Sequence, residues 1–192
     1  PGNQAHHFAG FLFNFGYENS WENNMFYEKN GVNGEDSVGQ SGIGVNVHPT
    51  YIEIYVLRYD ETDNKLKQIS YKYNVPSSIG TSFHKIKVVD NATGRISFYL
   101  DNVLFAYVEY SGAGLLPASV TNYNESYYRT AEIYNAKGDL QAKATDALIA
   151  EIKSMGMGSR ARVLNVDNVS LKKTNKGLKI NSAYLTLSSD IA

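Results

Sequence analysis

The chain of 192 residues contains no cysteine, a single tryptophan and only four prolines. Without cysteine it can form neither disulfides nor zinc or iron–sulfur sites built on thiolates. Its 18 basic and 19 acidic residues nearly cancel, which argues against a nucleic-acid surface because such surfaces usually have a basic excess. The chain also lacks an apolar run long enough for a membrane helix, so we expect no membrane insertion.

Tyrosine and glycine are abundant, with 15 and 16 copies. Together with frequent asparagine and serine, they are typical of short β-strands joined by tight turns. Period-two alternation of apolar and polar residues, which indicates a half-buried strand, is clearest over residues 51–59. Its two faces are Ile52, Ile54 and Val56 on one side, and Tyr51, Glu53, Tyr55 and Tyr59 on the other. Residues 43–48 alternate similarly, and the acidic residues 60–64 followed by residues 66–75 predict a hairpin.

Residues 83–110 predict three consecutive strands joined by short turns, which is a β-meander. The first turn, at residues 90–94, supplies the asparagine and glycine that positive backbone φ angles favour. Asp101 and Asn102 form the second turn. Further along the chain, residues 129–141 predict another hairpin.

The segment near residues 139–155 spaces its apolar residues at helical intervals, with Asp139 available as an N-cap. We expect one short helix there, although residues 147–155 would also suit a strand. Apart from this helix, the chain predicts an all-β domain over residues 1–173. Residues 174–192 are expected to form a linker and either an edge strand or the start of a following domain.

Three short motifs point to a fold family. Phe83 and His84 begin a strand, residues 100–102 read Leu-Asp-Asn at a turn, and residues 167–169 read Asp-Asn-Val. This set resembles the concanavalin A-like lectin/glucanase superfamily, in which Trp-His, Val-Asp-Gly and a closing Asp-Asn-Val are common at these places. The resemblance implies a two-sheet antiparallel β-sandwich of the jelly-roll type. It implies no single activity, because the superfamily holds lectins, carbohydrate-binding modules, laminin G-like domains, glycoside hydrolases and polysaccharide lyases.

No recognisable catalytic constellation is present. Glycosidases of the superfamily place their carboxylates on one strand as Glu-x-Asp-x-x-Glu, and this sequence lacks that motif. Glu53 is the lone carboxylate on its strand face. A lyase would need a tyrosine or histidine base beside arginine or asparagine. His48 and Arg129 are of the right types, but Tyr55 and Arg58 alternate to opposite faces, so we expect no catalytic residues.

The acidic turn after residue 59 offers oxygen ligands of the kind that Ca²⁺ prefers. Asp60 and Asp63 are the candidate ligands, although turn chemistry explains both without a metal. The sequence therefore implies no certain cofactor, and Ca²⁺ is kept as a candidate mainly because the superfamily often binds it.

Sugar binding needs exposed aromatic rings beside side chains that donate and accept hydrogen bonds. Residues 14–31 mix aromatic residues with asparagine and glutamate, and the tyrosine-rich side of residues 51–59 offers the floor of a groove. The candidate ligand-binding residues are Trp21, Asn23, Tyr27, Tyr51, Glu53 and Tyr55. Trp21 is equally well explained as a buried core residue.

These features favour a non-catalytic carbohydrate-binding or adhesion module from an exported, multidomain bacterial protein, secreted or at the cell surface. Its expected partners are polysaccharides or other glycans and neighbouring domains of the same chain, not nucleic acid. Two alternatives stay open. One is a glycoside hydrolase or polysaccharide lyase with atypical catalytic residues, and the other is a structural spacer domain.

Overall fold

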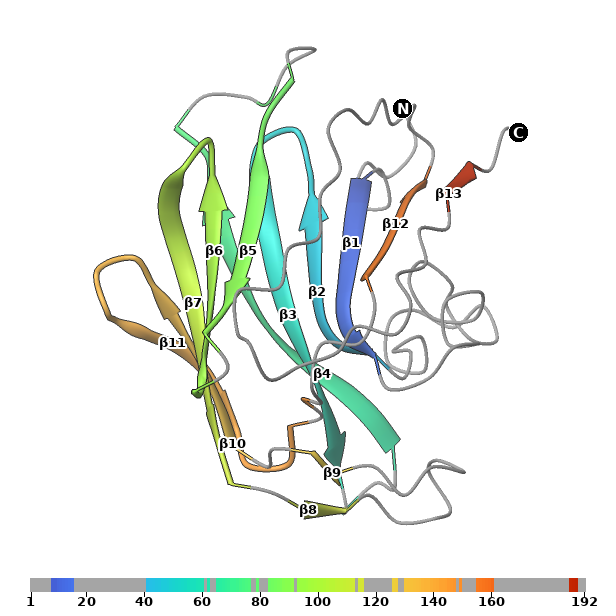
Figure 1. Cartoon of the computed structure of the whole chain (residues 1–192), viewed down its shortest axis with the longest axis vertical. Helices are drawn as coiled ribbons and strands as arrows, with labels where there is room; N and C mark the ends of the chain where they lie inside the picture. The colour runs from blue at the N-terminus through green and yellow to red at the C-terminus, as the bar shows by residue number, and fades with distance from the viewer. Residues whose placement is uncertain are drawn as a thin grey trace.

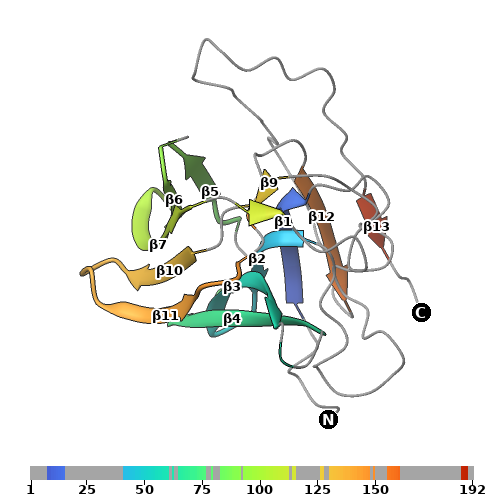
Figure 2. The ribbon, with the colours of Figure 1, turned by 90° about the horizontal axis from the view of Figure 1, so that it is seen from below.

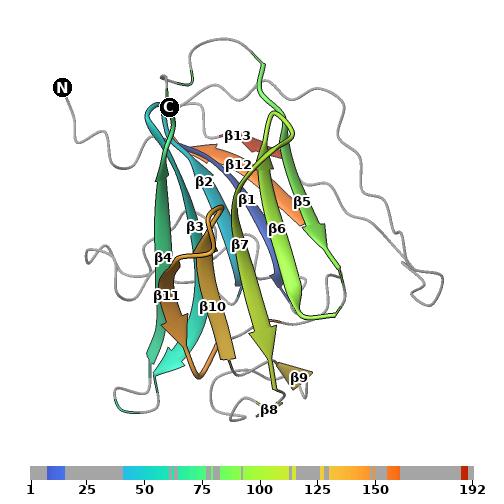
Figure 3. The same cartoon turned by 90° about the vertical axis from the view of Figure 1, so that its left-hand side faces the viewer.

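In a computed structural model of the chain, the regular elements are β-strands arranged in two facing sheets (Figures 1 and 3). The structure describes residues 8–15, 41–60, 62, 65–76, 79, 83–91, 93–112, 114–115, 126–127, 130–147, 149, 155–160 and 187–189. These ranges contain no helix, so none has the length and apolar character that crossing a bilayer requires. The expectation of an all-β, two-sheet sandwich is confirmed for this part of the chain.

The first sheet has six strands in the order β13-β12-β1-β2-β3-β4. Their bounds are β1 Phe8–Phe15, β2 Ser41–Val47, β3 Tyr51–Asp60, β4 Lys65–Asn74, β12 Met155–Arg160 and β13 Leu187–Ser189. Neighbouring strands are antiparallel except for β12 and β13, which are parallel. The expected hairpin is confirmed, since β3 and β4 pair from Tyr51 opposite Asn74 to Asp60 opposite Lys65.

The second sheet has five strands in the order β11-β10-β7-β6-β5. Their bounds are β5 Ile86–Asp90, β6 Arg95–Leu100, β7 Val103–Ser111, β10 Thr130–Asn135 and β11 Leu140–Ala144. The predicted meander corresponds to β5, β6 and β7, and the second predicted hairpin to β10 and β11. A separate pair consists of β8 Gly114–Leu115 and β9 Ser126–Tyr127.

Aliphatic and aromatic side chains fill the space between the sheets. The fully buried residues include Ile43, Val45, Ile52, Ile54 and Val56 from the first sheet, and Ile96, Phe98, Val108, Ala131 and Ile133 from the second. A register shift after Phe98 lets Phe105 and Ala106 both turn inward. The Phe105 ring stacks on Tyr73 of β4 with centroids 5.0 Å apart, which joins the two layers directly.

The prediction of a helix near residues 139–155 is wrong. Residues 140–144 form strand β11, and no described residue of that segment is helical. Asp139 does not act as an N-cap, because Asn135 Nδ2 donates a hydrogen bond to Asp139 Oδ2 at 2.8 Å across the β10–β11 turn. Leu140 is 52% exposed whereas Ala144 is buried. The β10–β11 turn therefore determines which side chains of β11 face inward, and these side chains alternate as in a strand.

The aromatic-His motif and the Asp-Asn turn meet in space. Asp101 and Asn102 adopt φ angles of 50° and 70°, which asparagine and aspartate tolerate better than most residues. The Asp101 carboxylate accepts a 2.8 Å hydrogen bond from the Lys85 N–H, and its other oxygen lies 2.8 Å from His84 Nδ1. These contacts lower the pKa of Asp101. In this structure the motif residues hold the β6–β7 turn against the start of β5.

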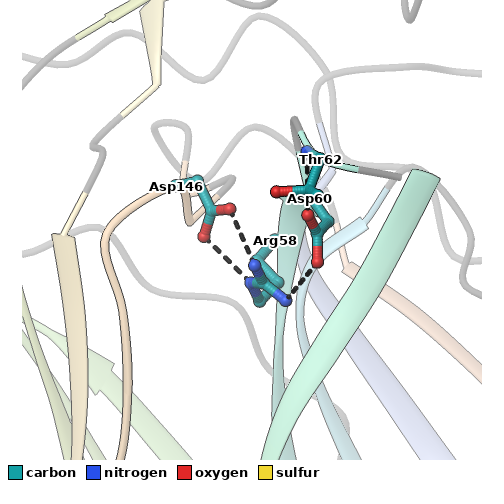
Figure 4. A network of polar contacts seen from close by, with 4 residues as sticks. All are labelled: Arg58, Asp60, Thr62 and Asp146. Atoms are coloured by element: carbon teal, nitrogen blue, oxygen red, sulfur yellow. Dashed lines mark hydrogen bonds and ion pairs between the residues drawn. The ribbon is translucent and has the colours of Figure 1, made fainter. Parts of the chain in front are cut away.

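An arginine connects the two sheets at one end of the sandwich (Figure 4). Arg58 of β3 forms two parallel bonds to Asp146, with Nε 3.0 Å from Oδ1 and Nη2 3.1 Å from Oδ2. Its Nη1 also lies 3.3 Å from Asp60 Oδ2, and Asp60 accepts the Thr62 N–H at 3.0 Å. The backbone pairs here too, as Arg58 bridges Ala147 just after β11. Strands β11 and β4 lie against each other on this side, as Figure 2 shows.

The Arg58–Asp146 pair is expected to stabilise the fold measurably. Arg58→Met and Asp146→Asn, made singly and together, should give a coupling free energy of about 1–2 kcal/mol in urea unfolding, because the contact is bidentate and partly shielded. The more exposed pair Arg95–Glu109 is the control, and Arg95→Met with Glu109→Gln should couple by less than about 0.5 kcal/mol. Equal coupling in the two cycles would contradict the special role of Arg58.

Candidate functional site

The structure places the predicted ligand-binding residues unequally. Trp21, Asn23 and Tyr27 lie outside the described residues, so their predicted role stays a prediction. Tyr51, Glu53 and Tyr55 share the outer face of the six-stranded sheet, since Ile52, Ile54 and Val56 on the other face are fully buried. The Tyr59 side chain is also outside the described part.

Tyr55 corrects the idea of an open tyrosine row. Its side chain is only 7% exposed, and it lies over Gly44, which is directly opposite on β2. A Cβ atom at Gly44 would be 1.9 Å from Tyr55 Cζ, so the ring occupies the space that a larger residue would fill. Burial raises the pKa of Tyr55 well above its usual value. Tyr55 therefore packs onto the sheet and does not extend the open surface around Tyr51.

Tyr51 is the centre of a compact polar group on this face. Its ring stacks on His48, with centroids 4.1 Å apart and planes 16° from parallel. Lys72 Nζ lies 5.1 Å from the centroid of the same ring. Glu53 is directly opposite Lys72 on β4 and directly opposite Asn46 on β2. We call Asn46, His48, Tyr51, Glu53 and Lys72 the Tyr51 cluster.

The tight turn between β2 and β3 explains the stacked rings. The His48 N–H donates to the Tyr51 carbonyl at 2.9 Å, which closes a turn through Pro49 and Thr50. Two further backbone bonds hold this turn, from the Ile79 N–H to the Pro49 carbonyl at 2.7 Å and from the Val75 N–H to the Thr50 carbonyl at 3.1 Å. The two ring-bearing residues are thus fixed side by side at the end of the hairpin.

The Tyr51 cluster combines one uncharged ring pair with groups of both charges. His48 is 4% exposed, and burial, with a smaller effect of Lys72, lowers its pKa from 6.5 to about 4. Its imidazole is therefore neutral near neutral pH. Partial burial, helped by Glu53, raises the pKa of Tyr51.

Hydrogen-bonding capacity remains open in this cluster. Asn46 Oδ1 is buried and has no hydrogen-bond partner among the described residues. The Glu53 carboxylate likewise forms no ion pair within the described ranges, although Lys72 is directly opposite on β4. Buried polar atoms usually find a partner, so the Asn46 oxygen is an exception, and the half-buried Glu53 carboxylate is the acceptor in this cluster that suits a ligand rich in hydroxyl groups.

The outer face of the five-stranded sheet has a second group of tyrosines, and its polar atoms are already paired. Tyr107 and Tyr134 stack with centroids 5.0 Å apart, and the Arg95 guanidinium lies 4.3 Å from the Tyr107 centroid. The Tyr134 hydroxyl donates to Glu132 at 2.6 Å, and Lys143 Nζ donates to the other oxygen at 2.6 Å. Arg95 also pairs with Glu109. The Glu132 contact raises the pKa of Tyr134 to about 12.

The sequence alone did not identify Asn46, His48 and Lys72 as binding residues beside Tyr51. Asn46 and His48 were visible as the polar side of an alternating run, and their spacing was the signal that placed them on one face. Lys72 needed the hairpin register, which places it beside Glu53. The stack of Tyr107 on Tyr134 needed the pairing of β7 with β10, which no local pattern specifies.

The structure describes one of the two candidate calcium ligands. The Asp60 carboxylate contacts Arg58 and the Thr62 N–H, and Asp63 lies outside the described residues. Where side chains are described, no three His, Asp or Glu residues gather closely enough to hold a metal ion. The predicted calcium site therefore stays a prediction.

Comparisons with known proteins give no further guide to this surface. No protein-family model, curated protein sequence or solved structure matches the chain.

Burial of neutral His48 predicts a specific loss of stability in acid. Between pH 6.5 and about 4 the unfolded chain binds a proton that folded His48 does not, so stability falls as the pH drops through this window. The loss should reach about 2–3 kcal/mol. Urea unfolding of the native chain and of His48→Phe, which keeps a stacked ring but cannot titrate, measures it. The same pH dependence in both proteins would contradict the prediction.

Proposed function

We propose that this chain is a non-catalytic carbohydrate-binding or adhesion module with a concanavalin A-like jelly-roll fold. It would belong to an exported, multidomain bacterial protein, secreted or at the cell surface, and bind a polysaccharide or another glycan. The observation that supports this most directly is the Tyr51 cluster. A partly exposed aromatic ring stands there beside a carboxylate, an ammonium group and a buried amide oxygen without a described partner.

The chemistry of sugars matches this arrangement. A pyranose has apolar C–H faces that pack on aromatic rings, and its hydroxyl groups need acceptors and donors at the edge of the ring. The half-buried Glu53 carboxylate offers acceptor oxygens, and the exposed Lys72 offers a donor. The tyrosines of the opposite sheet are less suited, because their hydroxyl and charged neighbours already bond to one another.

Binding is favoured over hydrolysis by the solitary position of Glu53. Glycoside hydrolysis uses two carboxyl groups about 5–10 Å apart. Within the described strands, the residues directly opposite Glu53 are Asn46 and Lys72, neither of which has a carboxyl group. The same cluster therefore supports recognition of a sugar better than cleavage of its glycosidic bond.

A glycan array and polysaccharide pull-down on the intact chain, with and without Ca²⁺, test this function. Tyr51→Ala should weaken binding about tenfold or more while leaving the unfolding transition cooperative, because it removes the aromatic contact. Tyr107→Ala is the matched control on the opposite sheet and should bind as the native chain does. Trp21→Ala tests in parallel whether the second predicted aromatic residue contributes.

Loss of binding in Tyr107→Ala alone would move the site to the other sheet. Absence of binding to every glycan would contradict the proposed function and favour a structural spacer. Release of shorter sugars from a bound polysaccharide would favour the enzymatic alternative.

A further inference from the structure

We propose that the Tyr51 cluster selects acidic glycans, with the carboxylate of a uronic acid bound by Lys72. This inference rests on the proposed function of the same site and names its ligand class. It follows from how the two faces of the Tyr51 ring are occupied.

One face of the Tyr51 ring is covered by a fixed group. The His48 imidazole stacks on it at 4.1 Å, is itself 4% exposed, and is held by the backbone bond across the β2–β3 turn. Strands β2 and β4 flank β3 on opposite sides, so His48 and Lys72 approach the ring from opposite directions. A sugar that stacks on Tyr51 must therefore take the side where Lys72 now lies.

The group on that side is free to move. Lys72 is exposed and has a flexible four-carbon stem, and a cation over an aromatic ring is weakly held at an exposed site. Lys72 is directly opposite Glu53, yet within the described part of the chain its ammonium has no ion pair with a carboxylate. Its charge is thus not committed to a partner of opposite sign.

Displacement of Lys72 from the Tyr51 ring by a sugar favours a ligand that carries a negative charge. When a neutral sugar displaces Lys72 from the ring, the ammonium loses its contact and gains only water. When a uronic acid displaces it, the ammonium can bond to the incoming carboxylate, and charge-assisted hydrogen bonds are stronger than neutral ones. The half-buried Glu53 carboxylate remains as an acceptor for the sugar hydroxyls, so the carboxylate and the hydroxyl groups of the ligand each meet a group of suitable chemistry.

The test compares two ligands that differ only in charge. Binding of oligogalacturonate with free carboxylates and of the same oligomer fully methyl-esterified is measured by isothermal titration calorimetry at low salt. The native chain should bind the free acid at least about tenfold more tightly, and this preference should shrink in about 0.5 M salt, which screens exposed charges.

Variants separate charge from packing. Lys72→Met, which removes the charge but keeps a long unbranched side chain, should lower affinity for the acid by about tenfold or more and leave affinity for the uncharged ester little changed. Lys72→Arg should keep the preference for the acid. Lys87→Met is the matched control, since Lys87 Nζ also lies 5.1 Å from a tyrosine ring, that of Tyr99, on the other sheet.

Equal affinity of the native chain for acid and ester would overturn the inference while leaving glycan binding intact. An acid preference that survives in Lys72→Met, or is lost in Lys87→Met, would also overturn it. Failure to bind the oligomers, together with failure on the glycan array, would overturn both the inference and the proposed function. Circular dichroism and thermal unfolding of each variant show that the fold is retained.

Discussion

Burial of one side of each central strand is the constraint on which the rest of the structure depends. Ile52, Ile54 and Val56 on β3 are fully buried, as are Ile96 and Phe98 on β6. Because side chains alternate with a period of two, shifting a strand by one residue would expose this whole set. The register is therefore fixed, and the polar residues between the buried ones are forced onto the outer faces. Any binding chemistry in the described part of this sandwich must be built from residues that the core leaves outside.

The outer faces of the two sheets differ in how their polar side chains are paired. On the five-stranded sheet, ring stacking and ion pairs join neighbouring strands into a network whose members bond to each other. Such a network fits a solvated face that needs no ligand, since Arg95, Lys143 and the two glutamates within it already have partners. On the six-stranded sheet, Tyr55 lies flat over Gly44, and the neighbouring Tyr51 stands between an imidazole and an ammonium group. The absence of a side chain at Gly44 thus lets Tyr55 pack against the sheet, while the β2–β3 turn holds Tyr51 in its stack with His48.

Local pattern was sufficient for most strands and insufficient for the contacts between distant ones. Alternation and turn residues predicted the meander and both hairpins, and parity placed Tyr51 with Glu53 and separated Tyr55 from Arg58. The helix failed because Leu140 and Ala144 fit helical spacing and strand alternation equally well. The Asn135–Asp139 contact decided between them. Exposure of Tyr55 could not be predicted, because it depends on the absence of a side chain at Gly44 across the sheet.

The Tyr51 cluster could be predicted only in part for the same reason. The sequence places its members on three strands, and their meeting depends on the register between β2, β3 and β4. The contact between Arg58 and Asp146 joins residues that are farther apart in the sequence, separated by 88 positions. Local propensity gives no information on such a pair, although its bidentate geometry makes it a firm connection between the sheets.

The asymmetry of the two Tyr51 faces links stability to recognition. His48 is buried and neutral, so it fixes the tyrosine ring before any ligand arrives, and a ring that is already ordered loses less entropy on binding. Lys72 is exposed and makes only a weak contact with the ring, so a ligand can take its place on that face at little cost. A cluster with two fixed faces would be a structural stack and nothing more. A cluster with two mobile faces would have to order itself on binding. Because His48 holds one face of the Tyr51 ring and Lys72 can leave the other, the ring is ordered before binding and its affinity still depends on the charge of the ligand.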